Sequence, residues 1–557
     1  MDAVCRLGIV GGGSVGISLL AQLIAHLESR ADSAGRVAGC HITLFEPAEK
    51  IGHGTAYQDD LNTNLLNVPA GNMSLYDTHR SHFVQWLAAQ PRALLQSYGI
   101  SDIDPAAFYP RPLFGRYVHE QFDRIIAQAA ALGVQVQVVR RAVVAIVRPE
   151  QGQGKQKRNG TASGNVQGQA QEKEQQQERP SHLQVTDLAG VSYVFDQLVL
   201  CNGNLASDKF DALVSCAGFM NSPYPVSALP QAIPAEATVA ILGANLSAID
   251  AVVALKAHGH AGQIHCFSRQ GVLPAVRSMH PTRMTRRLTR ADVRAMALAK
   301  GGRLDLDDAA GIVREQILAI DSGFDMRDMA GSGADAAAQL DHELDAACSG
   351  PRPWQAVLAA ANEVIDLLWF YLDQPARRHF QARWRSLWMS RRAMFPLQNA
   401  RQVQSLLKAG QLHIHGGFQA CEPQANGAGF VLRCRGAGGA LQQACDVVIN
   451  ATGFSQDVRR SPDPLITQLL QSGLARASEY GGFELDFDTG CLVTKGGAIA
   501  DNIAVLGSLA CGTYFWTVSM DVNARLANEQ AARLARKLSR RTLAEAAGEP
   551  ANAGVAT

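Results

Sequence analysis

A glycine-rich turn close to the N-terminus has the residue types and spacing that hold a phosphate group. Gly11, Gly13 and Gly16 occupy the glycine positions of a G-x-G-x-x-G pattern, which follows a short apolar run. The first glycine permits a tight turn, the second lets a pyrophosphate approach the backbone, and the third lets a helix pack close to the strand. The helical pattern covers residues 17–27, and Ser14 and Val15 within the turn are further cofactor-binding candidates. The free N–H groups at the start of the helix would face the phosphates. We therefore expect a strand, a dinucleotide-binding turn and a helix here.

An acidic residue stands where a dinucleotide-binding unit places its ribose contact. The apolar run 41–45 predicts the second strand, and Glu46 follows it. A carboxylate there can accept hydrogen bonds from the ribose hydroxyls of an adenosine. The spacing from Gly16 exceeds the usual interval of about 20 residues, and the additional residues lie in the Gly- and Ala-rich stretch 31–39. The combination of a strand, a glycine turn, a helix and an acidic residue favours a binding site for an adenine dinucleotide over a glycine loop without such a function.

A second glycine turn, which follows the apolar run 238–242, departs from the same pattern at one position. Gly243 opens the turn, but Asn245 stands where the second glycine would let a pyrophosphate touch the backbone. The next helical pattern contains Ser247, and the strand pattern after it ends just before Arg269. A basic residue at this edge, where NAD enzymes place an acid, suits the 2′-phosphate of NADPH. The alternative is a second domain that keeps its fold but binds no nucleotide.

Further segments carry a resemblance to a known family. Residues 52–57 (GHGTAY) and 65–70 (LLNVPA) resemble the GxGxAY…LNVPA signature of an FAD/NAD(P)-binding family. That family lies close to the flavin N-hydroxylating and Baeyer–Villiger monooxygenases. The blocks 108–111, 114–117 and 243–250 extend the resemblance, which covers most of the chain. It implies that FAD occupies the first glycine turn.

The resemblance also implies roles for single residues. It places Asn67 beside the isoalloxazine ring of the flavin, and it makes Asn67 and His53 the catalytic candidates. A turn residue is the alternative for Asn67, and a hydrogen-bonded surface group is the favoured alternative for His53. Further cofactor-binding candidates are Arg116, Val143, Asn202, Gly203, Gly453 and Gly507.

The chain is expected to be an α/β protein with two Rossmann-like dinucleotide-binding domains. Residues 196–204 and 446–454 each contain an acid, an apolar strand and a small-residue turn. Such strands join the two nucleotide domains in the resembling flavoproteins, and we assign both to the FAD-binding domain. Ser508 stands where those proteins often carry an Asp next to the ribityl phosphate. The expected parts are an FAD-binding domain, 1–235 and 446–557, and an NAD(P)-binding-like domain, 236–445.

Two insertions are expected within these domains. Residues 150–180 are rich in Gln, Gly, Lys and Glu, which predicts a disordered surface insertion between two strands. Residues 277–397 have helical periodicity and hold four of the six tryptophans, which predicts a packed helical insertion. The basic residues at its start favour a solvated helix face over a site for an anionic substrate or for cofactor phosphates. They are Arg277, Arg283, Arg286, Arg287 and Arg290.

Composition restricts the partners and the compartment. The chain has 557 residues and a formal charge of +1, which offers no global attraction to nucleic acid or to an anionic membrane. No run of about 20 apolar residues is present, and the early glycine turn leaves no room for a signal peptide. The 11 cysteines form no CxxC pair and no metal-ligand spacing. We therefore expect a cytoplasmic protein with reduced thiols and no metal.

Together these observations predict an FAD-dependent oxidoreductase that uses NADPH and molecular oxygen. The resemblance implies a monooxygenase that oxygenates a small metabolite, for example by N-hydroxylation, through a flavin peroxide. One departure keeps other classes open, because the related enzymes carry an F-x-G-x-x-x-H block and residues 216–225 contain no histidine. The alternatives are a flavin reductase or dehydrogenase without oxygenation, and a non-catalytic flavin-binding protein. The sequence indicates neither the substrate nor the oligomeric state.

Overall fold

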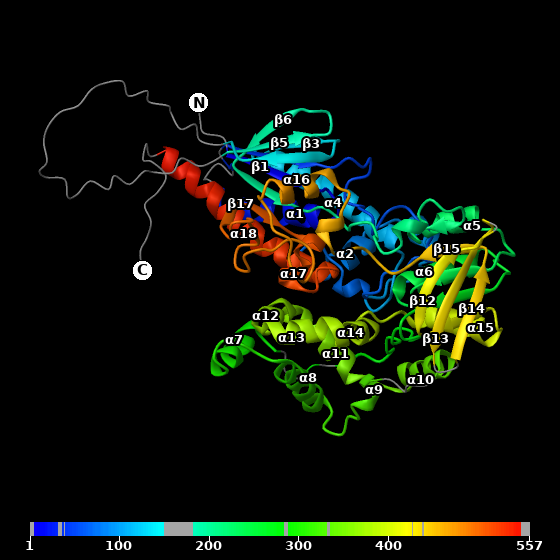
Figure 1. The fold of residues 1–557 in the computed structure, drawn as a ribbon. Helices are drawn as coiled ribbons and strands as arrows, with labels where there is room; N and C mark the ends of the chain where they lie inside the picture. The colour runs from blue at the N-terminus through cyan, green and yellow to red at the C-terminus, as the bar shows by residue number, and fades with distance from the viewer. Residues whose placement is uncertain are drawn as a thin grey trace, which may run out of the picture.

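Three lobes make up the fold in the computed structural model of the chain (Figure 1). The first lobe contains both the beginning and the end of the chain, the second contains a separate parallel sheet, and the third consists of helices between residues 290 and 392. The structure describes residues 5–31, 36–37, 39–149, 182–282, 284, 288–330, 335–425, 427–436 and 439–546. The insertion expected at 150–180 lies outside the described residues.

A six-stranded sheet with the order β16-β17-β7-β1-β2-β3 forms the centre of the first lobe. β1 pairs in parallel with β2 on one side and with β7 on the other, and only β16 runs antiparallel to its neighbour. The central strands are apolar almost throughout because other elements cover both faces of a parallel sheet. Their bounds are β1 Cys5–Val10, β2 Cys40–Phe45, β3 Gln135–Val139, β7 Gln197–Leu200, β16 Cys491–Val493 and β17 Ile499–Val505.

Helices and a small antiparallel sheet cover this central sheet. Helix α1 packs against α18 and α4, while the small sheet contacts Phe45 through Tyr193 and Phe195. Two strands of the small sheet, β4 and β5, lie on either side of residues 150–181 in the chain and pair with each other, so the segment joins two strands as predicted. The strands are β4 Val143–Val147, β5 Leu183–Asp187 and β6 Ser192–Phe195. The helices are α1 Ser14–Glu28, α2 His82–Ala88, α3 Arg92–Ser97, α4 Arg111–Ala131, α16 Pro464–Gln471, α17 Cys511–Tyr514 and α18 Met520–Ala546.

The second lobe contains a five-stranded parallel sheet with the order β11-β10-β9-β15-β8. Helices α6 and α15 pack on it, and an antiparallel sheet of β12, β13 and β14 lies beside it (Figure 1). The parallel strands are β8 Phe219–Met220, β9 Val239–Leu242, β10 Ile264–Phe267, β11 Leu412–His415 and β15 Val447–Asn450. The other elements are α5 Leu229–Ala232, α6 Leu246–Ala257, α15 Leu397–Lys408, β12 Phe418–Pro423, β13 Phe430–Gly436 and β14 Gly439–Cys445.

This sheet corrects the expected domain limits. β15 pairs with β9 and β8 of the second sheet, so residues 447–450 do not add a strand to the FAD-binding domain. β8 also belongs to the second sheet, although it precedes the expected start at residue 236. The physical reason is that an acid followed by a buried apolar strand has the same pattern in either parallel sheet. The two-sheet α/β fold itself is as predicted.

The third lobe is the predicted helical insertion, and it contains buried aromatic side chains. Trp354 and Trp369 are buried, whereas Trp384 is exposed. The two ends of the lobe meet where Val276 pairs with Phe395 in an isolated parallel bridge, and both side chains pack in the hydrophobic core of the second lobe. No helix in the described part of the chain has both the length and the apolar surface that crossing a membrane requires. The helices are α7 Arg290–Ala299, α8 Leu306–Ile320, α9 Arg327–Ala330, α10 Ala336–Ser349, α11 Pro353–Ala360, α12 Ile365–Tyr371, α13 Gln374–His379 and α14 Arg385–Arg392.

A buried ion pair joins the first lobe to the second. Arg111, at the start of α4, donates to Asp250 Oδ2 on α6 at 3.0 Å, and Tyr224 Oη donates to the same oxygen at 2.6 Å. Arg111 Nε also donates to the carbonyl oxygen of Leu65 at 2.9 Å. Burial acts against the charge of Arg111, but Asp250 and Tyr224 outweigh it and raise the pKa of the guanidinium. Burial also raises the pKa of Asp250, against the lowering effect of Arg111 and of the Tyr224 hydroxyl. The pair links the two lobes through these hydrogen bonds.

Removing one ion of this pair should destabilise the whole protein. In an Asp250→Ala variant the Arg111 guanidinium would remain buried without its carboxylate, which typically costs about 3–5 kcal/mol. Urea unfolding followed by circular dichroism measures this loss. Glu422→Ala, which removes an exposed partner of Arg433, is the matched control and should cost about 1 kcal/mol or less. Equal losses in the two variants would contradict a structural role for the buried pair.

Candidate functional site

The first glycine turn needs its glycines for two different reasons. Gly11 has φ +106°, and a Cβ on it would lie 2.4 Å from the carbonyl oxygen of Cys201. A Cβ on Gly16 would lie 2.0 Å from the carbonyl oxygen of Gly11, so the fold itself requires glycine at both positions. A Cβ on Gly13 would meet only Gly54 Cα, at 3.6 Å, which is an ordinary contact. Gly13 therefore leaves backbone open to a ligand rather than solving a packing problem.

The loops after two other strands, β7 and β17, converge on this turn. The amide of Cys201, directly after β7, donates to the carbonyl of Val10 at 2.7 Å, which places Asn202 and Gly203 beside the turn. Gly507 follows β17 with φ +80°, and a Cβ on it would lie 3.7 Å from Val15, the second residue of α1. The Oδ1 atom of Asn202 is buried and has no hydrogen-bond donor within the described residues.

Glu46 lies at the same edge of the sheet. Its carboxylate accepts from the amides of Gly12 at 2.8 Å and Ala48 at 2.9 Å. Its own amide donates to the carbonyl of Val139 at the end of β3, a few residues before Val143. Val143 begins β4 and is buried, whereas the exposed Arg116 on α4 pairs with Glu120 at 2.9 Å. The structure therefore places Glu46 at the first glycine turn, whereas the guanidinium of Arg116 is ion-paired with Glu120 on α4.

The segment 52–57 runs directly over the first turn. The amide of Gly52 donates to the carbonyl of Gly12 at 2.7 Å, and Gly54 lies against Gly13. His53 is 8% exposed, with Nδ1 3.8 Å from Asp59 and its ring edge-on to His119. Burial lowers the pKa of His53, so its imidazole is neutral at pH 7. This enclosed position differs from the surface location that the favoured alternative supposed.

The second glycine turn has the same backbone form as the first. Gly243 has φ +128°, and a Cβ on it would lie 2.6 Å from the carbonyl oxygen of Ala451, which brings Gly453 to this turn. Asn245 caps α6 with φ −94° and ψ −167°, close to the values of Gly13, φ −71° and ψ −174°. Because neither residue needs a positive φ, the asparagine adds a side chain without backbone strain. That side chain is exposed and makes no capping hydrogen bond.

Ser247, in the first turn of α6, forms a side-chain hydrogen bond with Tyr224, which also donates to Asp250.

Three cations from different parts of the chain face one another near this turn. Arg269 follows β10 and donates to Ser386 Oγ at 2.6 Å, Arg385 begins α14, and Lys209 donates to the carbonyl of Thr452 at 3.2 Å. Burial first, then the charges of Arg385 and Arg269, lowers the pKa of Lys209. Within the described residues, no carboxylate oxygen lies within 4.0 Å of any of the three. They form a cationic cluster open to an anion.

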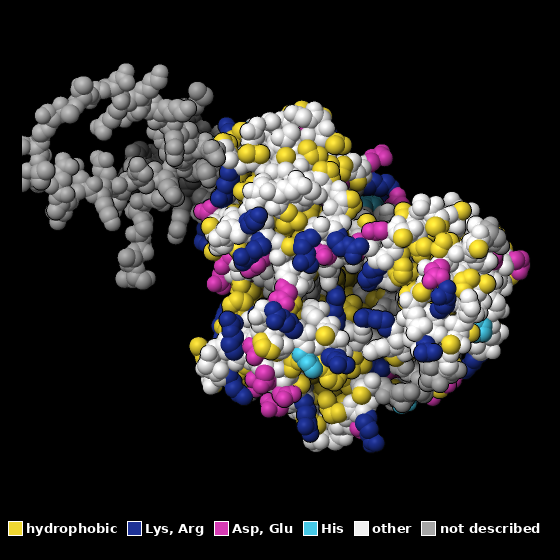
Figure 2. Space-filling model, in the orientation of Figure 1, with side chains coloured by type: hydrophobic (Ala, Val, Ile, Leu, Met, Phe, Trp, Pro, Cys, Tyr) yellow, Lys and Arg dark blue, Asp and Glu magenta, His cyan; other side chains and the backbone are white. Residues whose placement is uncertain are grey.

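Sequence reasoning found Arg269 but missed Lys209 and Arg385. No sequence signal could have joined them, because the three residues lie on three elements far apart in the chain. The basic stretch is also corrected: Arg290 is ion-paired with the buried Asp366 at 2.8 Å, and Arg277 is half-buried with its Nε atom shielded from solvent, so neither belongs to a solvated helix face. Residues 283, 286 and 287 lie outside the described residues. Figure 2 shows Lys and Arg side chains around the hollow where the lobes meet.

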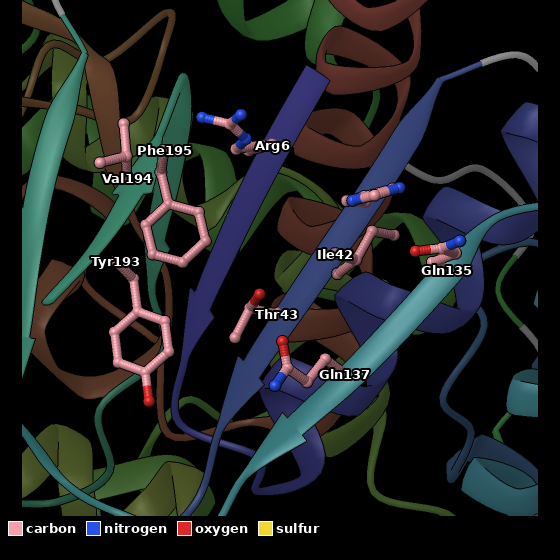
Figure 3. A pocket seen from close by; sticks show the side chains of 9 residues that line it. Arg6, Ile42, Thr43, Gln135, Gln137, Tyr193, Val194 and Phe195 are labelled. Carbon is pink, nitrogen blue, oxygen red and sulfur yellow. The ribbon is translucent and has the colours of Figure 1, made fainter. Parts of the chain in front are cut away.

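A separate cavity of about 370 Å³ lies in the first lobe, away from both turns (Figure 3). Arg6 and Thr43 of the central sheet and Tyr193 of β6 line it, together with Gln135 and Gln137 of β3. Arg6 belongs to the first half of β1, whereas the glycine turn follows the end of that strand. None of the candidate residues lines this cavity.

Comparison with known proteins agrees with this geometry. Residues 8–167 match the family model described as FAD-NAD(P)-binding. The Uncharacterized protein YdhS of Escherichia coli (strain K12) is 22% identical over 514 residues, which cover 84% of this chain and 86% of that protein. The L-lysine 6-monooxygenase of Pseudomonas syringae has a TM-score of 0.55 and 17% identity, covering 96% of this chain and 99% of that one. The ornithine N-hydroxylase KtzI of Kutzneria sp. 744 has a TM-score of 0.52 and 14% identity, covering 97% and 99%.

These likenesses establish an FAD-NAD(P)-binding domain in the first part of the chain and a fold shared with the lysine and ornithine hydroxylating enzymes. They confirm the Rossmann-type α/β fold that the glycine turns predicted.

Substitutions of Gly16 and of Gly13 should have different effects on the stability of the ligand-free protein. Gly16→Ala places a methyl group on the Gly11 carbonyl and should destabilise the ligand-free protein by about 1–3 kcal/mol, as overpacking does. Gly13→Ala should change stability by less than about 1 kcal/mol, because its φ suits alanine and its Cβ has room. Thermal unfolding of the ligand-free variants measures both. A large loss in Gly13→Ala would show that this glycine serves packing after all.

Proposed function

We propose that the chain is an FAD-dependent, NADPH-consuming monooxygenase of the cytoplasm that oxygenates a small metabolite. The observation that carries the proposal is the pair of glycine turns, each at the carboxyl edge of its own parallel sheet, with a cationic cluster at the second. Ligands of open α/β sheets bind at such edges. The ornithine N-hydroxylase structure that shares this fold is described as a complex with FADred, NADP+ and L-orn.

The residues of the first turn fit FAD. Gly13 leaves its backbone open, and the N-terminus of α1 offers free N–H groups to a pyrophosphate. Glu46 has lone pairs left for ribose hydroxyls, and the buried Oδ1 of Asn202 lacks a donor that a flavin hydroxyl could supply. Gly507 brings the loop after β17 to the same place. Ser508 donates to Asn204 Oδ1 at 2.6 Å, so it does not replace the carboxylate of the related flavoproteins directly.

The second turn suits NADPH rather than NADH. The 2′-phosphate carries two negative charges, and Arg269, Arg385 and Lys209 supply positive charge. Asp208 acts on Lys209, but the charges of Arg385 and Arg269 outweigh it and, with burial, lower the pKa of Lys209. Asn245 has an exposed amide at the point of closest approach, where it can donate to a phosphate oxygen. These features support a functional nucleotide site against the alternative of a degenerate domain.

Bound FAD would accept a hydride from NADPH and pass the electrons on to molecular oxygen. The chain's own residues bind and orient the reactants. Asn67 is half-buried in the segment expected at the flavin ring and is our candidate for orienting it, while the neutral His53 lies under the turn beside Asp59.

The proposal is tested by following NADPH consumption together with oxygen uptake, product and hydrogen peroxide. Purified protein should be yellow and release FAD, and one substrate from a metabolite screen should couple NADPH consumption to an oxygenated product. Peroxide alone, with every substrate, would favour a reductase or dehydrogenase. Flavin that NADPH does not reduce would favour a binding protein. Gly13→Ala should fold but lose most of its FAD, because the methyl group occupies the pyrophosphate position.

Arg269→Ala should weaken NADPH binding selectively. Loss of a charge-assisted contact to the 2′-phosphate typically costs about 1.5–3 kcal/mol, roughly ten- to a hundredfold in affinity. The apparent KM for NADPH in flavin reduction should rise by that factor, with little change for NADH. Arg433→Ala, on the exposed strand β13, is the matched control. An unchanged KM for NADPH would place the 2′-phosphate elsewhere.

A further inference from the structure

Most enclosed arginines of this chain have a carboxylate partner. Arg111, Arg290, Arg352, Arg391 and Arg525 each have a carboxylate oxygen within 3.0 Å. Such pairing is the rule, because a charge taken out of water is costly unless an opposite charge and hydrogen bonds compensate it. An enclosed arginine without a carboxylate is therefore an exception that needs an explanation.

Arg277 and Arg392 are such exceptions. Arg392 is 6% exposed, and the Nε atoms of both residues are buried without an acceptor. Over the part of the chain that the structure describes, no carboxylate oxygen lies within 4.0 Å of either guanidinium. Their direct contacts are with neutral groups: Arg277 Nη2 lies 3.4 Å from the carbonyl of Asn67, and Arg392 Nη2 lies 2.6 Å from Asn362 Oδ1. Asn362 in turn donates to Asp521 Oδ2 at 2.7 Å, so Asp521 acts on Arg392 across this amide, and burial still lowers the pKa of Arg392.

The fold brings these two cations to one place. The amide of Arg277 donates to the carbonyl of Phe395 at 3.1 Å, and Phe395 is three residues after Arg392 at the end of α14. Burial and then the charge of Arg392 lower the pKa of Arg277 to about 10, which is the effect expected of two neighbouring like charges. In the ligand-free protein the two guanidinium groups therefore repel each other.

Aromatic rings surround the two charges. The guanidinium of Arg392 lies over the ring of Trp516 at 5.2 Å, and that of Arg277 lies over Phe108 at 5.8 Å. Trp388 is one helical turn before Arg392 on α14, so both project from the same face, and its ring meets Trp516 edge-on at 6.0 Å. The Nε1 atom of Trp388 is also buried without an acceptor. Three donors thus lack acceptors in an environment with apolar walls.

We propose that Arg277 and Arg392 bind the carboxylate of an acidic substrate and hold it next to Asn67. Two guanidinium groups can each donate to a carboxylate oxygen, and charge-assisted bonds of this kind are the strong ones. The indole N–H of Trp388 can donate a further bond, and the aromatic rings suit an apolar body. The inference rests on the proposed function, because Asn67 belongs to the segment expected beside the flavin.

Carboxylate binding can be measured without knowledge of the substrate. Acetate, benzoate and phenylacetate are titrated against the flavin-loaded protein, and acetamide, benzamide and phenylacetamide serve as neutral controls of the same shape. At least one acid should raise the melting temperature and quench tryptophan fluorescence, while its amide should do neither. Inorganic phosphate tests whether the site prefers a different anion. If no carboxylate changes either signal, or the amides act equally, the proposal is wrong.

Variants assign the effect to the two arginines. Arg277→Gln and Arg392→Gln should each weaken binding of the acid by roughly ten- to a hundredfold, and Arg392→Lys should recover part of it. Arg433→Gln, on the exposed β13, should leave it unchanged. Without an anion, Arg392→Met should melt no lower than the unaltered protein, because it removes a buried charge that contacts no carboxylate directly, whereas Arg352→Met should melt lower because it leaves Glu343 short of a partner.

Flavin content and its reduction potential are recorded for the same variants. If Arg277→Gln and Arg392→Gln shift the potential or lose flavin while acid binding is unaltered, the two charges serve the flavin and the proposal is overturned. If the protein retains no flavin at all but binds an acid through these residues, the proposed function fails and the carboxylate site stands. The two failures are therefore distinguishable.

Discussion

The relative position of the two candidate sites depends on the buried ion pair between Arg111 and Asp250. Arg111 also holds the carbonyl of Leu65, two residues before Asn67, while Asp250 lies on α6, five residues after Asn245. One guanidinium thus links the segment expected at the flavin to the helix of the second glycine turn. Because both ions are out of solvent, moving the lobes apart at this point would leave two uncompensated charges. The pair therefore sets the separation across which a nicotinamide would have to meet a flavin.

The basic side chains of this chain are arranged in two ways. Paired arginines, such as Arg352 and Arg391 on either side of Glu343, stabilise the helical lobe. Unpaired cations gather instead in two places, with Lys209 by the second turn and Arg277 near Asn67 as examples. Such clusters cost stability in the ligand-free protein, which is the usual consequence of building a binding site for an anion. The helical insertion contributes a residue to both clusters, from the two ends of α14.

Local patterns allowed much of the first lobe to be predicted. Gly16 has to be a glycine because a Cβ on it would meet the carbonyl of Gly11, and Gly11 because it has a positive φ and lies against the residue after β7, the neighbouring strand in the sheet. The G-x-G-x-x-G spacing identified the unit without knowledge of that second contact. The glycine pattern also suggested that Asn245 replaces a residue that has to be glycine. The backbone of Asn245 is extended and needs no positive φ, so an asparagine fits there without strain. Sequence reasoning also placed residues 446–454 in the wrong sheet, since a buried parallel strand has one pattern whichever sheet it joins.

The sequence by itself determined the two dinucleotide turns, the α/β class and the helical insertion, because each depends on short-range spacing of glycine, apolar and acidic residues. Only the tertiary structure decided which charges meet. Lys209, Arg269 and Arg385 come from three separate elements, and Arg277 and Arg392 are adjacent only because Val276 pairs with Phe395. Whether an arginine is solvated or enclosed depends on what packs over it, and that packing is set by residues distant in the sequence.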